Sequence, residues 1–241
     1  MINILIPMAG AGSRFSKAGY SKPKPFIDVA GKPMIVRVLE NLTCPNAHFI
    51  LVARQAHLDA EIALVREIQS QFNATFISID NLTEGTACTI LHARKLINND
   101  QPLLIANSDQ IVDFDPEKFI MDCIERGADG SILTFNDFSK NPKWSFARID
   151  QNGVVQEVRE KYPISAIATV GIYFFTKGSD FVDAAIEMIL HQDRVNNEYY
   201  TCPAYNYLIK NNKKIITFDI LPEAMHGIGT PEDLDLYLAH Q

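Results

Sequence analysis

Cysteine pairs, tryptophan and an excess of positive charge are all missing or scarce in this sequence. Among 241 residues there are 4 cysteines and 1 tryptophan. The cysteines lie far apart, at Cys44, Cys88, Cys123 and Cys202. A zinc site or a disulfide framework would show close pairs, so this spacing predicts free thiols in a reducing compartment, the cytoplasm.

Long hydrophobic runs and low-complexity segments are also missing. The apolar start has no basic segment before it and leads directly into a glycine-rich loop, so it predicts neither a signal peptide nor a membrane span. Hydrophobic residues make up 47% of the chain, enough for a sizeable core. We therefore expect one domain over residues 1–241, located in the cytoplasm and not associated with a membrane.

The charge balance argues against nucleic acid as a partner. The formal net charge is −7, whereas a nucleic-acid-binding protein needs an extended basic surface. Residues 1–32 are the exception, because they contain only one acid, Asp28, and five cations: Arg14, Lys17, Lys22, Lys24 and Lys32. A single basic segment in an acidic protein suits a small polyanion, although ordinary solvated lysines would give the same composition.

Strand and helix patterns alternate in the first half of the chain. Apolar runs predict strands at residues 2–7, 49–53, 75–79 and 103–107, with helices at 33–42, 58–72 and 86–97 between them. This alternation predicts an α/β fold, a Rossmann-like three-layer sandwich with a mostly parallel central sheet. Asp115-Pro116-Glu117 predicts the start of a further helix, with Asp115 as its cap.

The second half of the chain has a more antiparallel pattern. Strands are expected at residues 131–135, 146–149, 154–157, 167–175 and 215–220, and helices at 179–191, 203–210 and from Pro231 on. Thr230 is the expected cap of the last helix. Asn152-Gly153 predicts a hairpin turn. We expect a nucleotide-binding half over residues 1–115 and a substrate-facing half over 116–241.

The loop after the first strand has the residues of a triphosphate-binding site. Gly10 and Gly12 allow the backbone to approach a ligand closely, and Arg14 and Lys24 supply charge. The dinucleotide-binding fingerprint would need a third glycine where Phe15 stands, and a Walker loop would need Ser or Thr where Pro33 follows Lys32.

Several motifs in order give the chain a resemblance to a known family. The glycine-rich loop at residues 8–15 is followed by Pro23-Lys24-Pro25, Gly31-Lys32-Pro33, Glu84-Gly85-Thr86-Ala87 and Asn107-Ser108-Asp109. Glu160-Lys161, the segment 171–174 and the segment 229–234 come after these. The series resembles the nucleotidyltransferases that make activated sugars, also called sugar-nucleotide pyrophosphorylases, whose fold is related to that of GT-A glycosyltransferases.

The resemblance implies a role for each matching residue. Arg14 and Lys24 would be catalytic, and Asp109 would hold Mg²⁺. Glu160, Lys161 and Gly171 would bind a small phosphorylated acceptor. The nucleoside triphosphate would contact Met8, Ala9, Gly10, Ala11, Gly12, Ser13, Arg14, Lys24, Glu84, Gly85, Thr86, Asn107, Ser108 and Asp109.

One position departs from the family pattern. A second metal-binding aspartate usually precedes the late Gly-Thr by two residues, and Gly227 stands there. The resemblance leaves three explanations: Asp109 acts with phosphates and water alone, Glu223 or Asp219 takes over, or activity is lost.

Finer details are similar to cytidylyltransferases of bacterial capsule and surface-polysaccharide clusters, including those that activate phosphoglutamine. They imply CTP, or else UTP, as donor, a role in capsule biosynthesis and, by analogy, a homodimer. Two alternatives remain open: a glycosyltransferase that uses a nucleotide-sugar, and a nucleotide-sensing relative without catalysis. A lone histidine such as His226 is interpreted as structural. Trp144, Tyr199 and Tyr200 could line the acceptor pocket, but aromatic residues in β-like segments are usually core, and we do not assign them to the site.

Overall fold

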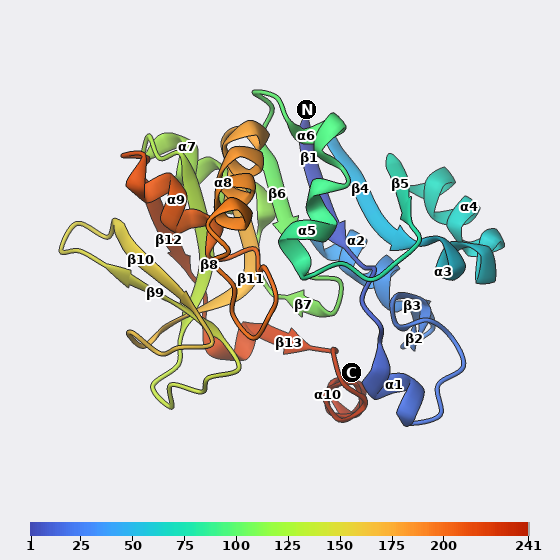
Figure 1. The fold of residues 1–241 in the computed structure, drawn as a ribbon. Coiled ribbons are helices and arrows are strands. Elements are labelled where there is room, and N and C mark those ends of the chain that lie inside the picture. The colour runs from blue at the N-terminus through green and yellow to red at the C-terminus, as the bar shows by residue number, and fades with distance from the viewer. Residues whose placement is uncertain (241) are drawn as a thin grey trace.

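A computed structural model describes residues 1–240, and Gln241, where the expected domain ends, lies outside the described residues. A nine-stranded sheet has the order β10-β9-β11-β6-β1-β4-β5, with β8 beside β11 and β12 beside β8 (Figure 1). Its strands are β1 (Ile2–Pro7), β4 (Ala47–Arg54), β5 (Ala74–Ile79), β6 (Leu103–Ala106), β8 (Gly130–Asn136), β9 (Ser145–Ile149), β10 (Val155–Glu160), β11 (Ile167–Phe175) and β12 (Ile215–Asp219).

Helices cover both faces of this sheet. The α-helices are α1 (Ser13–Lys17), α2 (Met34–Leu42), α3 (Gln55–Ala60), α4 (Ile62–Gln71), α5 (Thr86–Leu91), α6 (Arg94–Ile97), α7 (Pro116–Glu125), α8 (Gly178–Leu190), α9 (Ala204–Lys210) and α10 (Pro231–Ala239). One core cluster packs α5, α6, α8 and α9 against the sheet, and a second packs α2, α4 and α7 against the other face. The three-layer α/β prediction is confirmed.

The sheet changes direction at β11. Strands β1, β4, β5 and β6 pair in parallel, as alternating strands and helices require. Strand β11 runs antiparallel to both β6 and β8, and β9 and β10 form the hairpin whose turn contains Asn152-Gly153. The predicted antiparallel part is therefore continuous with the parallel part in one sheet.

Small elements close the end of the sheet where β1 and β6 finish. Strand β7 (Gln110–Val112) pairs with β13 (Met225–Gly227), and β2 (Asp28–Val29) pairs with β3 (Lys32–Pro33). Helix α10 packs beside α1 through a separate cluster that includes Phe15, Ile228 and Leu234 (Figure 1). The last part of the chain thus returns to the loop that follows the first strand.

Two predicted helices are each divided in two. The helix expected over residues 58–72 is α3 and α4, separated at Glu61, whose φ of −130° is not helical. The helix expected over 86–97 is α5 and α6, with a break at Ala93. The predicted caps are confirmed, since Asp115 accepts from the backbone N–H groups of Glu117 and Lys118, and Thr230 accepts from that of Asp233. Among residues 1–240, no helix combines the length and the apolar character that crossing a bilayer requires.

Candidate active site

The loop between β1 and α1 is shaped by a glycine that no other residue replaces easily. Gly12 has a φ of +62°, and a Cβ there would lie 3.1 Å from the Cβ of Lys24. The missing side chain therefore lets the Lys24 segment pack directly against the loop. Phe15, only 1% exposed, anchors α1 in the core below.

Lys24 is held by its neighbours in the chain. It begins a short 3-10 turn, Lys24–Phe26, in which Pro25 and Phe26 are buried. Its Nζ lies 2.5 Å from Oδ2 of Asp109, and the two side chains are 20% and 29% exposed. The flanking prolines restrict the backbone, so the ammonium is presented from a rigid segment.

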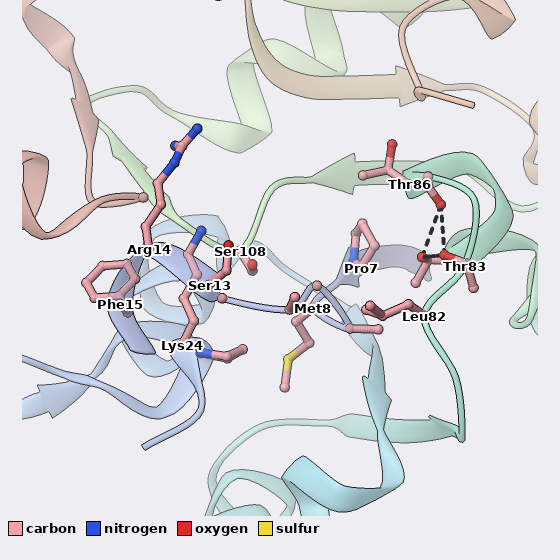
Figure 2. A pocket seen from close by; sticks show the side chains of 18 of the residues that line it. Pro7, Met8, Ser13, Arg14, Phe15, Lys24, Leu82, Thr83, Thr86 and Ser108 are labelled. Atoms are coloured by element: carbon pink, nitrogen blue, oxygen red, sulfur yellow. Dashed lines mark hydrogen bonds between the residues drawn. The ribbon is translucent and has the colours of Figure 1, made fainter. Parts of the chain in front are cut away.

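A cavity of about 450 Å³ opens over the glycine loop. Figure 2 shows Ser13, Arg14 and Lys24 on one side of it, and Met8, Leu82 and Thr83 on the other. It is lined by Pro7, Met8, Ala9, Gly10, Ala11, Gly12, Ser13, Arg14, Phe15, Lys24, Pro25, Leu82, Thr83, Gly85, Thr86, Thr89, Ser108, Glu198 and Gly229. A cationic side opposite an apolar, hydroxyl-bearing side suits a phosphate chain attached to a flat ring system, as in a nucleotide.

The turn at residues 84–86 borders this cavity, but the side chain of Glu84 does not line it. Gly85 has a φ of +118°, and a Cβ there would lie 2.4 Å from the carbonyl oxygen of Tyr199. Glu84 instead forms an ion pair with Arg194, with 2.9 Å between Oε2 and Nη2. Of the predicted residues of this turn, Gly85 and Thr86 therefore face the cavity.

A second cavity, of about 430 Å³, lies next to the first. Asn107, Asp109, Glu160, Lys161 and Gly171 line it, and all five were singled out from the sequence. Four residues line both cavities: Pro7, Arg14, Thr86 and Ser108. Ligands in the two cavities would meet beside Arg14.

Asp109 is held at the border of the two cavities by backbone contacts. It follows β6, and its carbonyl oxygen accepts from the N–H of Ile228 at 2.9 Å. A Cβ on Gly229 would lie 2.7 Å from its carboxylate, so that glycine leaves room beside Asp109. A carboxylate that already holds a cation, the Lys24 ammonium, is the type of oxygen ligand that Mg²⁺ takes together with phosphates and water. Asp109 would supply one oxygen ligand to such an ion.

Neither Asp219 nor Glu223 supplies a carboxylate to the site in place of the aspartate that is missing at Gly227. Asp219 accepts from the hydroxyl of Thr134 at the end of β12, and neither Asp219 nor Glu223 lines the two cavities. The carboxylate near Gly227 is that of Asp233, whose Oδ2 would lie 3.9 Å from a Cβ on that glycine. Within residues 1–240 no three His, Cys, Asp or Glu side chains gather closely enough to hold a metal by themselves.

Glu160 is the last residue of β10 and Lys161 follows it, and both line the second cavity. Burial raises the pKa of Glu160, which accepts a hydrogen bond from Ser145. Lys161 has a φ of +54°, in the left-handed region that lysine seldom adopts, and its N–H donates to the carbonyl of Trp144 at 3.0 Å. Its Nζ lies 2.6 Å from the hydroxyl of Tyr200.

Several lining residues had not been picked out as site residues. Trp144, Tyr200 and Thr201 line the second cavity, and Glu198 and Thr83 line the first. Tyr199 is 2% exposed and belongs to the core, as expected. His226 contacts Asp113, with 2.9 Å between Nε2 and Oδ2, outside both cavities. No local pattern marks Tyr200, because its partner Lys161 is 39 residues away.

Comparison with known proteins gives a family match and distant relatives. The model of the family described as nucleotidyl transferase matches residues 4–218. A mannose-1-phosphate guanyltransferase of Aspergillus fumigatus is 27% identical over 131 residues, which are 54% of this chain and 36% of that protein. The chain spans between 36% and 61% of the length of such guanylyltransferases.

Solved structures match over the whole length of the chain. A nucleoside-diphosphate-sugar pyrophosphorylase from Vibrio cholerae RC9 is 26% identical, with a TM-score of 0.82 and 98% and 99% of the two chains covered. A UDP-glucose pyrophosphorylase in complex with UDP-glucose is 19% identical, with a TM-score of 0.79 and coverage of 100% and 98%. At that identity the second likeness is one of fold.

Proposed function

The chain belongs to the nucleotidyl transferase family, and from this membership and the paired cavities we propose that it transfers a nucleotidyl group from a nucleoside triphosphate to a small phosphate monoester. The first cavity takes the triphosphate and the second takes the acceptor. The observation that carries the proposal is the shared wall: Arg14 and Ser108 line both cavities, so the two substrates meet there.

The reaction needs alignment more than proton transfer. An oxygen of the acceptor phosphate attacks the α-phosphorus, the new P–O bond forms as the bond to the β-phosphate breaks, and pyrophosphate leaves. The acceptor phosphate is largely ionised at neutral pH, since its second pKa is about 6. No side chain therefore has to remove a proton from it, and catalysis rests on positioning and charge neutralisation.

The residues divide this work between them. Arg14 binds the departing pyrophosphate, Lys24 stabilises the charge that develops on the α-phosphate, and Lys161 holds the acceptor phosphate. Asp109 is the residue that would hold a magnesium ion, and the ion supplies neutralisation of the phosphate charge when bound. Glu160, which is partly buried in the second cavity, contacts hydroxyl or ammonium groups of the acceptor.

Removing either cation of the first cavity tests these roles. We expect Lys24→Ala and Arg14→Ala each to lower kcat by a factor on the order of 10² to 10³ without loss of folding. Lys17→Ala is the matched control, because Lys17 is an exposed lysine of α1 that lines neither cavity. Turnover by Lys24→Ala equal to that of the Lys17→Ala control would remove Lys24 from the mechanism.

The proposal also specifies the base of the nucleoside triphosphate and the class of acceptor. Motif details favour CTP, then UTP, and an acceptor that is a sugar 1-phosphate or a phosphorylated amino acid such as phosphoglutamine, used in capsule or surface-polysaccharide synthesis. The names of the related proteins add GTP with mannose 1-phosphate, and a UDP-sugar, to the donors and acceptors to be tried.

A matrix of the four ribonucleoside triphosphates and dTTP against phosphorylated acceptors, read by pyrophosphate release, decides among these. We expect release only in wells that contain both a donor and a phosphate monoester. Triphosphate binding without release in any well would instead support a nucleotide-sensing relative. Additional wells contain a nucleotide-sugar in place of the triphosphate, and release of the nucleoside diphosphate there would support a glycosyltransferase.

A further inference from the structure

A four-residue segment, Glu198–Thr201, lies between the two cavities. Glu198 lines the first cavity, and Tyr200 and Thr201 line the second. We call these four residues the bridge. Tyr199, between Glu198 and Tyr200, is buried in the core, so this short segment borders both cavities and is anchored at its centre.

The bridge is fixed to the 84–86 turn by backbone contacts. The N–H of Tyr199 donates to the carbonyl of Glu84 at 2.7 Å, and the carbonyl of Tyr199 accepts from the N–H of Ala87 at 3.0 Å. Gly85 has no side chain at the point where the two backbones touch. The hydroxyl of Thr201 also lies 3.0 Å from that of Thr86. Three hydrogen bonds therefore hold the turn and the bridge together.

On its other side the bridge holds Lys161. The Tyr200 hydroxyl accepts from Nζ of Lys161 at 2.6 Å, and the same Nζ lies 4.4 Å from the centre of the Tyr200 ring. Burial, aided by Glu198, raises the pKa of Tyr200, so the phenol stays protonated and neutral at physiological pH. A neutral phenol leaves the positive charge of Lys161 free to bind an anion.

The strained backbone at Lys161 agrees with a positioned side chain. The left-handed φ of +54° turns the chain sharply after β10 and directs Lys161 toward the bridge, 39 residues further on. A solvated lysine would need neither this conformation nor a partner, and strained residues of this kind concentrate at functional sites.

We propose that Tyr200 is a positioning residue that aims the Lys161 ammonium at the acceptor phosphate, and that the bridge couples occupation of the first cavity to anion binding in the second. This inference rests on the proposed function, since it takes Lys161 as the residue that binds the acceptor phosphate. A ligand on the 84–86 turn would restrain the bridge and thus hold Lys161 in its binding position, so the two substrates bind with positive cooperativity.

Binding of inorganic phosphate tests the inference without knowledge of the acceptor. Broadening of the ³¹P signal of phosphate is measured on the intact protein, with the first cavity either free or saturated with a non-hydrolysable α,β-methylene triphosphate and Mg²⁺. We expect the wild type to bind phosphate more tightly when the analogue is bound. Tyr200→Phe is expected to weaken phosphate binding by about fivefold, because it removes one hydrogen bond to a charged group, and to leave binding of the analogue unchanged.

Matched variants separate the possible failures. Tyr162→Phe is the control, because Tyr162 is a neighbouring tyrosine with 65% exposure. If Lys161→Ala binds phosphate as the wild type does, the proposed acceptor role of Lys161 fails. If Lys161→Ala loses phosphate binding but Tyr200→Phe behaves like Tyr162→Phe, only the role of Tyr200 fails. Equal phosphate affinity with and without the analogue would overturn the coupling.

Discussion

The position of Glu160 in the site conflicts with protein stability. Its pKa is raised because burial disfavours the carboxylate, and the hydrogen bond from Ser145 and the nearby charge of Lys161 only partly offset this. The folded protein therefore binds a proton at Glu160 more tightly than the unfolded chain does. Stability is greatest below the unfolded pKa and falls as the pH rises through the folded one. Holding an ionised Glu160 at neutral pH thus costs stability, which a substrate-binding role would explain.

Glu160→Gln tests this conflict. At pH 7 we expect the variant to have a higher Tm than the wild type, because the partly buried charge is gone. We also expect weaker acceptor binding, because the carboxylate that contacts the acceptor is gone. The difference in Tm should shrink as the pH falls through the raised pKa of Glu160, because the wild type then takes up its proton. Chemical or thermal unfolding across this pH range measures it.

Glu157→Gln is the comparison, since hydrogen bonds from Arg148 and Arg159 lower the pKa of this partly exposed carboxylate. The ionised Glu157 stabilises the folded protein above its unfolded pKa, and this contribution is lost as the pH falls. Glu157→Gln should therefore lower the Tm at pH 7, whereas Glu160→Gln should raise it. A Glu160→Gln protein that is less stable than the wild type at pH 7 would contradict our account.

Site residues were predictable where they belong to a short local sequence motif. Gly12, Lys24 and Asp109 belong to short motifs, and the structure brings them together. Tyr200 was interpreted as core and Thr201 was not singled out, because their partners, Lys161 and Thr86, are 39 and 115 residues away. An aromatic residue in a β-like segment is most often core, and only tertiary contacts distinguish the exception.

At the scale of elements, the irregularity of β11 shapes the second cavity. The pairing of β11 with β8 shifts register between Thr169 and Tyr173, and Gly171 lies in that interval with a φ of +94°. Its carbonyl accepts from the N–H of Asn107 at 3.2 Å, so the bulge meets the turn that carries Asp109. Such bulges often redirect side chains beside active sites.

Gly171→Ala should damage both stability and acceptor binding. A Cβ there would lie 2.2 Å from Nδ2 of Asn107, so the Asn107 side chain has to move away. We expect a loss of about 1–3 kcal/mol in the free energy of unfolding, with a raised acceptor KM. Gly19→Ala is the control, because Gly19 has a φ of +88° and nothing within 4 Å of a Cβ. Equal losses in the two variants would show that backbone strain alone, and not the contact with Asn107, is responsible.

Element boundaries were harder to predict than element types. The caps at Asp115 and Thr230 are local hydrogen bonds, and both were found from sequence. The breaks at Glu61 and Ala93 were not, because the apolar pattern continues through them while the backbone turns. Strands β7 and β13 span three residues each and owe their existence to pairing with each other.

At the scale of the whole molecule, the site depends on both ends of the sequence. The glycine loop follows the first strand, whereas Gly229 and Ile228 come from the segment before the last described helix. The expected halves, residues 1–115 and 116–241, share one sheet through the pairing of β6 with β11. The cavity border therefore forms only when the whole fold is assembled, and the three-layer architecture was predictable because each strand-helix alternation is local.

The central claim is that the glycine loop, Arg14 and Lys24 bind a triphosphate together with a divalent ion. Calorimetric titration of the wild type with each common ribonucleoside or deoxyribonucleoside triphosphate in magnesium buffer tests it directly. Our account predicts saturable binding of at least one triphosphate, with a dissociation constant on the order of 1 µM to 1 mM, strongly weakened in Arg14→Ala and kept in Lys17→Ala. Absence of heat from every triphosphate, or equal binding by wild type and Arg14→Ala, would contradict it.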